Sequence, residues 1–480
     1  MRALHVASEV APFAQSGGLA DVVAGLPNAL AELGEQCAVL VPLYRGVAQK
    51  LALTDAGPIE VVVGKTTFRG GLKAARVGRV AYGFLDLPAL YDREGSLYGP
   101  RETSEFGDNH LRFGALGAAA LTCGERLLGG VDLLHVHDWQ GGAAAIYARL
   151  ARPALRIVAT IHNLAFRGVF GKFVMDELGL PWSLFTTRGI EFYDQVSLLK
   201  GGIAVSDATT TVSPSYAREI LTPARGEALD EFLRWDVARL VGIVNGIDVT
   251  AWDPATDPAL PANFSREVLG ARMQNRTALC AEMQLAPKDG EPLIGAIARM
   301  SDQKGLDLIA DLVSDLARIG ARMIVLGSGE PDLEARFRWL GEVYRDHLAV
   351  RIGFDHAMSR RIYGGLDFFA MPSRFEPCGL GQLYAMRYGV VPIVHAVGGL
   401  RDTVIDPGDG DLARGLGTGI RFDAPNAGAL RGALERAVRL YRDPVAFATL
   451  RRAAMARDSS WAASARQYLE LYRSLAELSG

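Results

Sequence analysis

Residues 2–41 read RALHVASEVAPFAQSGGLADVVAGLPNALAELGEQCAVLV, and this stretch decides the fold class. Apolar residues at 2–7 predict a buried strand, and the apolar periodicity from about 20 to 33 predicts a helix that Gly34 ends. A second apolar strand is predicted at 37–41. Strand, helix and strand in this order form a βαβ unit, and such units build parallel sheets with right-handed crossovers.

The same alternation of strands and helices continues on both sides of a break near residues 241–261. The break contains Val-Asn-Gly-Ile-Asp and then Trp252-Asp-Pro, which is typical of a connecting segment. A chain of 480 residues also exceeds what one hydrophobic core usually serves. We therefore predict two doubly wound, Rossmann-like α/β domains facing a central cleft, at residues 1–245 and 246–458. The other predicted strands and helices lie at 133–136, 156–161, 293–298, 306–319, 322–326, 350–352, 368–371, 382–388 and 392–394.

Composition and charge narrow the possible partners. Hydrophobic residues make up 49% and charged residues 22% of the chain, which is ordinary for a globular protein. The formal net charge of −3 gives no basic footprint for nucleic acid, and no apolar stretch reaches the length of a membrane span. The first residues lack the apolar run of a signal peptide, and four scattered cysteines show no CxxC spacing. We expect a cytoplasmic protein with no nucleic-acid or membrane partner and no structural zinc.

The first candidate site is a glycine pair, Gly17 and Gly18, in the segment from Gln15 to Asp21 that enters the first predicted helix. Backbone N–H groups and the helix dipole at such a turn can hold a phosphate group. A Gly-Gly turn before a helix is also ordinary chain geometry, so this segment alone leaves both interpretations open.

Two further candidates follow predicted strands. His135, His137 and Asp138 invite a metal interpretation, but the two histidines lie two residues apart and no further His or Cys ligands lie near them in the sequence. Catalytic zinc is therefore not expected, and Asp138 is better placed to accept a bond from a sugar hydroxyl. His162 and Asn163 end the strand at 156–161, where a hydrogen-bonded core histidine is an equal alternative.

Three charged residues mark the ends of strands in the second predicted domain. Arg299 and Lys304 lie five residues apart between a strand and a helix, where they can grip a diphosphate and neutralise it as it leaves. An exposed cationic loop remains the alternative for this pair. Glu376, in the segment 372–380, offers a carboxylate beside backbone N–H groups at a helix start, or is simply an acid at a helix entry.

Taken together, these motifs resemble the bacterial glycogen synthases and plant starch synthases, which are retaining glucosyltransferases of the two-domain GT-B fold. The resemblance runs nearly from end to end. The stretches that carry it are 8–14, 17–21, 90–93, 108–109, 112–113, 137–139, 160–164, 199–202, 211–214, 245–248, 303–306, 372–380 and 460–461.

The resemblance implies an ADP-glucose:1,4-α-glucan 4-α-glucosyltransferase that extends the non-reducing end of glycogen and requires no metal or other cofactor. It implies a glucan acceptor side in the first domain, a nucleotide-sugar donor side in the second, and a final helix at 459–480 that crosses back to the first. The implied catalytic residues are His162, Arg299, Lys304 and Glu376. The implied substrate-binding residues are Gln15, Gly17, Gly18, Tyr91, Asp138, Asn163, Asn245, Phe354, Cys378, Gly379 and Leu380.

One departure from the family pattern concerns the donor phosphates. The family's usual lysine before the glycine pair is Gln15 here, so a cation expected near the phosphates is missing. A charge-assisted hydrogen bond is worth about 1.5–3 kcal/mol, so donor affinity is expected to fall unless another group compensates. Two alternatives stay open at this point: another GT-B transferase with a small acceptor, and a non-catalytic nucleotide-sugar or glycan-binding protein.

Overall fold

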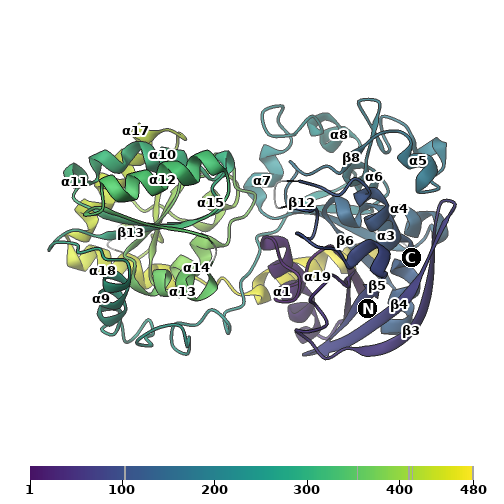
Figure 1. Ribbon diagram of the computed structural model, residues 1–480, viewed down its shortest axis with the longest axis horizontal. Helices are drawn as coiled ribbons and strands as arrows, with labels where there is room; N and C mark the ends of the chain where they lie inside the picture. Colours follow the sequence, from purple (N-terminus) through teal and green to yellow (C-terminus); the bar gives the residue numbers. More distant parts are fainter. Residues whose placement is uncertain (102–103, 354, 409–410, 413, 478–480) are drawn as a thin grey trace. The chain divides into compact units, whose positions relative to one another are not determined.

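The computed structural model describes residues 1–101, 104–353, 355–408, 411–412 and 414–477. The chain divides into two compact units: Met1–Gly246 together with Trp461–Gly480, and Ile247–Ser460 (Figure 1). The boundary predicted after residue 245 lies one residue before this division. Residues 459–460, which were predicted to belong to the returning helix, fall in the second unit.

The sheet of the first unit is built around its earliest strand. Seven neighbouring strands run parallel in the order β12-β11-β7-β6-β1-β2-β5. Because β2 lies on one side of β1 and β6 on the other, the winding reverses between β1 and β6, which is where doubly wound sheets place ligands. The bounds are Arg2–Val6 for β1, Gln36–Pro42 for β2, Val80–Asp86 for β5, Leu133–His137 for β6, Arg156–Ile161 for β7, Ala208–Thr211 for β11 and Leu240–Gly242 for β12.

Two features of this sheet differ from the predictions. β3 (Thr54–Val63) and β4 (Thr66–Val77) form an antiparallel hairpin at its edge, where only parallel pairing was predicted. Gly64, with φ of +55°, lies in the two-residue link between them, which is too short for a parallel crossover. The connecting segment predicted from residue 241 also begins inside β12, because Leu240–Gly242 pairs with β11.

The helices of the first unit include one from the far end of the chain. The indole of Trp461 on α19 (Trp461–Glu477) fills the space beside Gly25 on α1 (Gly18–Glu32), where a Cβ atom would lie 2.0 Å from the indole Nε1. α19 therefore packs against α1 at Gly25, where the absence of a side chain leaves room for the indole. The other elements are α2 Pro88–Tyr91, α3 Asn109–Leu128, α4 Asp138–Ala151, β8 Val169–Phe170, α5 Val174–Glu177, η1 Trp182–Leu184, β9 Glu191–Phe192, β10 Gln195–Ser197, α6 Leu198–Ala204, α7 Pro214–Glu219 and α8 Asp230–Trp235.

The second unit contains one parallel sheet with the order β15-β14-β13-β16-β17-β18. Its winding reverses between β13 and β16, in the same way as in the first unit. The strands are β13 Leu293–Ile297, β14 Arg322–Gly327, β15 Leu348–Ile352, β16 Phe368–Met371, β17 Val391–His395 and β18 Ile420–Phe422.

Helices cover both faces of this second sheet (Figure 1). The predicted helix 306–319 is interrupted by a 3-10 turn at Val313–Asp315, which separates α10 from α11. The helices are α9 Arg272–Glu282, η2 Asp302–Lys304, α10 Leu306–Leu312, η3 Val313–Asp315, α11 Leu316–Ile319, α12 Pro331–Val343, α13 His356–Gly365, α14 Gly381–Arg387, α15 Gly398–Thr403, α17 Ala427–Tyr441 and α18 Pro444–Ala456.

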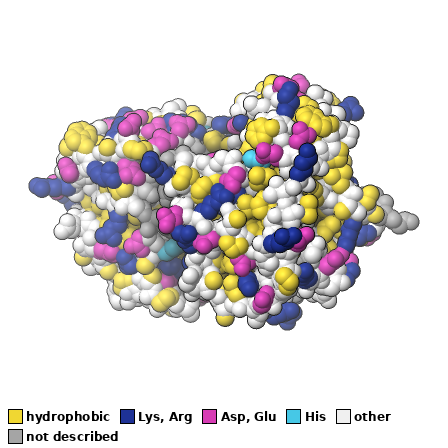
Figure 2. Space-filling model, turned by 45° about the vertical axis from the view of Figure 1, so that its right-hand side comes forward, with side chains coloured by type: hydrophobic (Ala, Val, Ile, Leu, Met, Phe, Trp, Pro, Cys, Tyr) yellow, Lys and Arg dark blue, Asp and Glu magenta, His cyan; other side chains and the backbone are white. Residues whose placement is uncertain are grey.

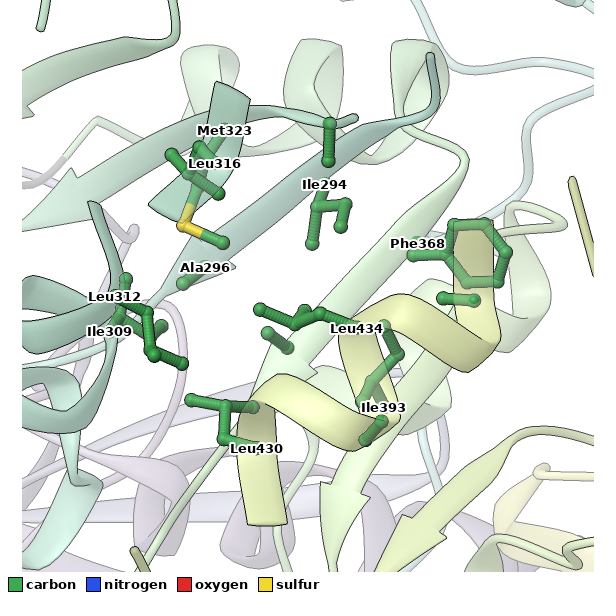
Figure 3. Close-up of a cluster of buried hydrophobic side chains, with 14 of the residues drawn as sticks. Ile294, Ala296, Ile309, Leu312, Leu316, Met323, Phe368, Ile393, Leu430 and Leu434 are labelled. Atoms are coloured by element: carbon green, nitrogen blue, oxygen red, sulfur yellow. The ribbon is translucent and has the colours of Figure 1, made fainter. Parts of the chain in front are cut away.

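The core of the second unit follows from the two-residue period of its strands. Ile294 and Ala296 of β13 point to one face, where they join Leu430 and Leu434 of α17 (Figure 3). Leu293 points to the other face and joins a second cluster, which includes side chains of α9 and α13. Side chains alternate between the two faces of a strand, so a strand that is apolar throughout must be covered on both.

The surface agrees with the charge balance of the sequence. On the face drawn in Figure 2, acidic and basic side chains lie interspersed. Within the described part of the chain, no helix is both long enough and apolar enough to cross a bilayer.

Candidate active site

The carboxyl end of β1 leads into a loop that the Glu9 carboxylate organises. Its oxygens accept bonds from the Ser16 N–H at 2.6 Å, the Ser16 hydroxyl at 2.6 Å and the Gly17 N–H at 3.2 Å, and also from the Tyr98 hydroxyl. The Gly17 N–H, one of the groups considered for a phosphate, is therefore already hydrogen-bonded to Glu9. N–H groups able to meet a phosphate begin at Gly18, the first residue of α1.

Gln15 lies in the same loop and contacts a second acidic residue. Its amide nitrogen donates to Asp21 Oδ2 at 3.1 Å. Burial, reinforced by the charge of Glu9, raises the pKa of Asp21 to about 6. Among the described residues, no lysine or arginine forms an ion pair with Glu9 or Asp21. With glutamine at position 15, neither of these two carboxyl groups has an ion-pair partner in the part of the chain that the structure describes.

Asp138 combines a strained backbone with an unusual ionisation state. It directly follows β6 with φ of +52°, a conformation that costs energy for a residue with a side chain. Its Oδ1 accepts the His162 N–H at 2.7 Å. Burial raises the pKa of Asp138 to about 7, although bonds from the His162 and Asn163 N–H groups oppose the rise. Near neutral pH this carboxyl can both donate and accept a hydrogen bond.

His162 follows β7 and belongs to a chain of three imidazoles. Its Nε2 lies 2.9 Å from His137 Nδ1, and His137 Nε2 lies 3.2 Å from His5 Nδ1. No further His or Cys ligand lies near His135 and His137 in the sequence, but strand pairing adds His5, because β1 pairs with β6 in a register that puts His5 opposite His135. Burial lowers the pKa of His162 to about 3, so its ring is neutral.

One ring nitrogen from each of His5, His135 and His137 lies within 4.8 Å of the other two, which raises the question of a metal centre. Both nitrogens of His135 contact hydroxyls, those of Tyr472 and Thr160, each at 2.5 Å. Both nitrogens of His137 contact histidines, and the His135 and His137 rings stack with centroids 4.3 Å apart. The three histidines therefore do not direct three free nitrogen lone pairs at one position, as a metal ion would require. The cluster fits a stack of hydrogen-bonded rings better than a metal site.

In the second unit, the ends of β13 and β16 bring opposite charges together. The Lys304 ammonium contacts Glu376 Oε2 at 2.7 Å, and Glu376 also accepts the Ser373 hydroxyl at 3.0 Å. Glu376 is buried with 5% of its surface exposed. Arg299 is exposed, and its side chain forms no hydrogen bond or ion pair with the other described residues. Its charge is available to an anion.

The segment after Glu376 depends on one glycine. Gly379 has φ of +74°, and a Cβ atom there would lie 2.6 Å from Gln382 Oε1. Leu380 caps α14, while Cys378 is buried. The turn therefore presents backbone rather than side chain at the start of α14.

The remaining predicted residues have different surroundings. Tyr91 is 1% exposed and its hydroxyl donates to the Arg112 carbonyl at 2.6 Å, so its ring belongs to the core. The Asn163 side-chain oxygen accepts the Ala165 N–H at 3.1 Å. The buried Asn245 Oδ1 has no hydrogen-bond partner among the described residues. Phe354 lies outside the described residues.

Sequence reasoning assigned no role to Glu9, Tyr98 or His5. Glu9 could have been found, because it follows the first strand within three residues and the carboxyl end of that strand was expected to face ligands. Tyr98 gave no such signal, because its contact with Glu9 bridges 89 residues of chain.

Comparison with known proteins gives matches over nearly the whole chain. Residues 2–235 match the family described as "Starch synthase catalytic domain", and residues 282–449 match "Glycosyl transferases group 1". Glycogen synthase 1 of Rhizobium meliloti is 43% identical over 480 residues, covering 99% of each chain. A glycogen synthase of Anaeromyxobacter sp. is 44% identical, covering 99% of this chain and 100% of its own.

Solved structures agree with these matches. The catalytic domain of starch synthase IV from Arabidopsis thaliana, bound to ADP and acarbose, superposes with a TM-score of 0.90 at 33% identity, covering 99% of each chain. Sucrose-phosphate synthase from Thermosynechococcus elongatus gives a TM-score of 0.61 at 19% identity over 99% of each chain, which shows the shared fold.

Proposed function

Because this chain belongs to the glycogen and starch synthase family, we propose that it transfers glucose from ADP-glucose to the non-reducing end of an α-1,4-glucan with retention of configuration. The predicted family, the GT-B fold class and the glycosyltransferase activity are confirmed. The donor, the stereochemistry and the roles of individual residues are the proposal.

The observation that carries the proposal is the charge arrangement at the reversal point of the second sheet. Arg299 offers a guanidinium that forms no ion pair with the described residues, and Lys304 lies 2.7 Å from the buried Glu376 carboxylate. Two cations beside a strand end suit a diphosphate, whose developing charge they stabilise as it leaves. Glu376 is then the acceptor for glucose hydroxyls.

The first unit supplies groups for the sugar and the phosphates. Asp138, with a pKa near 7, and His162 offer hydrogen bonds to glucose hydroxyls, and the start of α1 from Gly18 offers N–H groups. We propose same-face attack: the bond from the anomeric carbon to the phosphate oxygen breaks, the bond to the acceptor 4-oxygen forms, and the leaving phosphate takes the hydroxyl proton. A carboxylate pair for double displacement is not required in this scheme.

We propose that the reaction requires no metal, because Arg299 and Lys304 supply the positive charge that a cation would otherwise provide. A cytoplasmic location is also part of the proposal. All four cysteines are free, and three of them are buried, which suits a reducing compartment.

The test is incorporation of labelled glucose into glycogen from ADP-glucose and from UDP-glucose, with EDTA present in a parallel series. Wild-type protein should incorporate glucose from ADP-glucose, and Lys304→Ala should lower the rate by about 10²–10³-fold because charge stabilisation of the leaving group is lost. Lys288→Ala is the matched control, because Lys288 is an exposed lysine of the same unit that forms no ion pair with the described residues.

Each arm of this assay has a result that counts against the proposal. Transfer to glucose or fructose 6-phosphate but not to glycogen would indicate a small-acceptor transferase. Loss of activity in EDTA that Mg²⁺ restores would contradict the metal-free mechanism. Binding of ADP-glucose without transfer to any acceptor would indicate a binding protein.

A further inference from the structure

Three imidazoles connect the His162 ring to the interior of the first unit. The contacts run from His162 Nε2 to His137 Nδ1 at 2.9 Å and from His137 Nε2 to His5 Nδ1 at 3.2 Å. His5 and His137 have no exposed surface, whereas His162 is only partly buried. The chain therefore has one sealed end, at His5 Nε2, and one end from which a ligand can be contacted, at His162 Nδ1.

All three rings are neutral at physiological pH. Burial lowers the pKa of His5 and of His162 to about 3 each, and it lowers the pKa of His137 well below its ordinary value. A neutral imidazole carries one N–H and one bare nitrogen, so each ring donates from one side and accepts on the other.

This chemistry couples the three tautomers. If His5 carries its proton on Nδ1, it donates to His137 Nε2, which forces the proton of His137 onto Nδ1. His137 then donates to His162 Nε2, and the proton of His162 must lie on Nδ1 as well. The opposite choice at His5 places every proton on Nε2. Only these two arrangements make both hydrogen bonds.

The sealed end decides between the two arrangements. His5 Nε2 is buried and has no hydrogen-bond partner among the described residues. An N–H group buried without an acceptor is rarer in proteins than an acceptor left without a donor. We propose that His5 and His137 are positioning residues that hold His162 as its Nδ1–H tautomer, so that the ring offers a hydrogen-bond donor to the bound sugar.

The contact with sugar rests on the proposed function, but the tautomer does not. Asp138 reinforces the arrangement from the other side, because its carboxylate binds the His162 backbone N–H at 2.7 Å and fixes the position of the residue. A donor at His162 suits a hydroxyl oxygen of glucose. The proposal thus gives a role to His5 of β1 and His137 of β6, two fully buried histidines to which the proposed function assigns none.

The direct experiment is a long-range nitrogen–proton NMR correlation on the full-length protein labelled with ¹⁵N-histidine. The His162 signals are assigned by their loss in His162→Asn. We expect Nδ1 of His162 to have the shift of a protonated ring nitrogen and Nε2 that of an unprotonated one. A protonated Nε2 in the wild-type protein, or averaging between the two forms, would overturn the proposal.

Variants then test the coupling. His5→Phe removes the hydrogen bond from His5 Nδ1 to His137 Nε2, which fixes the tautomers of the chain. His162 should then become a mixture of its two tautomers, and kcat/KM for ADP-glucose should fall about five- to tenfold. His5→Asn should retain the Nδ1–H tautomer of His162 and the wild-type kcat/KM, because the asparagine amide N–H occupies the place of the imidazole Nδ1–H. The matched control is His135→Phe, because His135 is equally buried and stacks on His137 but contacts the Tyr472 and Thr160 hydroxyls rather than a ring nitrogen of the imidazole chain.

The outcomes separate this proposal from the proposed function. If His135→Phe changes the His162 tautomer as much as His5→Phe does, packing rather than hydrogen bonding controls the ring, and the proposal fails. If the wild-type protein has the expected tautomer but transfers no glucose, the proposed function fails and the tautomer assignment stands.

Discussion

Asp138 combines two features that cost stability at a position where we propose a contact with glucose. Its left-handed backbone and its buried carboxyl both cost free energy. Its bonds to two backbone N–H groups recover only part of that cost, since its pKa still lies well above its ordinary value. Residues with such costs are expected where function requires them.

We predict that Asp138→Asn stabilises the protein at pH 8 by on the order of 2 kcal/mol while it removes most activity. The pKa of Asp138 rises from 3.8 to about 7 on folding, so the folded state favours the protonated form. Ionisation of Asp138 therefore lowers the free energy of unfolding. This loss is absent below about pH 4, grows as the pH rises, and is complete above about pH 7. Asparagine keeps an acceptor for both N–H groups and tolerates positive φ.

Thermal unfolding of both proteins between pH 5 and 8 checks this prediction. The gain in the melting temperature of the variant should shrink steadily toward the acidic end. A gain that is equal at every pH would show that ionisation of Asp138 is not its cause.

Gln15 gives a second prediction at this scale. Gln15→Lys should lower the pKa of Asp21 from about 6, because an ammonium group would replace an amide beside that carboxylate. The same positive charge should lower KM for ADP-glucose by about tenfold if the donor phosphates bind beside the loop that contains residue 15. The measurement is KM between pH 5.5 and 8, with the neutral Gln15→Met as control. An unchanged KM would place the phosphates elsewhere.

Among the elements, α1 and α19 show how one missing side chain joins two helices. Gly25 sits in the middle of α1, where glycine lowers helix stability, yet it provides the space that the Trp461 indole occupies. The return of the last helix to the first unit was an implication of the family resemblance, but its contact at Gly25 was visible only in three dimensions.

We predict that Gly25→Ala destabilises the first unit by about 1–3 kcal/mol, because the new methyl group would meet the indole 2.0 Å away. Gly432→Ala is the matched control. Gly432 also lies inside a helix, α17, but nothing lies within 4 Å of its ideal Cβ position, so alanine should stabilise by about 0.5–1 kcal/mol. Urea unfolding of the two variants should shift the midpoint in opposite directions. A shift in the same direction would contradict the packing argument.

At the scale of the whole molecule, the two compact units differ in how the chain builds them. The second unit is one continuous segment, Ile247–Ser460, whereas the first needs Trp461–Gly480 in addition to Met1–Gly246. α19 contributes several buried side chains to the first unit, and the Tyr472 hydroxyl contacts His135 at 2.5 Å. The first unit is therefore incomplete without the end of the chain.

We predict that the fragment 247–460 folds alone, while the fragment 1–246 does not. Joining 1–246 to 461–480 through a short Gly/Ser linker should restore folding, because Ile247 and Ser460 form a β-bridge and bring the two cut points together. Circular dichroism with thermal unfolding distinguishes the three fragments. Cooperative unfolding of 1–246 by itself would show that α19 is dispensable.

The sequence by itself determined the local order of elements and the positions where charge and glycine accumulate. The strand at 156–161 and that at 368–371 were predicted with the bounds observed, because apolar runs between turns carry their own signal. Arg299, Lys304 and Glu376 were identified as candidates because they follow such strands. These features depend on neighbours within a few residues.

Tertiary structure decided what depends on pairing between distant segments. The antiparallel hairpin β3–β4, the contact of Tyr98 with Glu9, and the imidazole chain from His5 to His162 each join residues whose separation along the chain says nothing about their distance in space. Register between strands places His5 opposite His135, and no local pattern encodes that register. The sequence therefore predicted candidate residues for the site, while strand pairing determined which of those side chains touch.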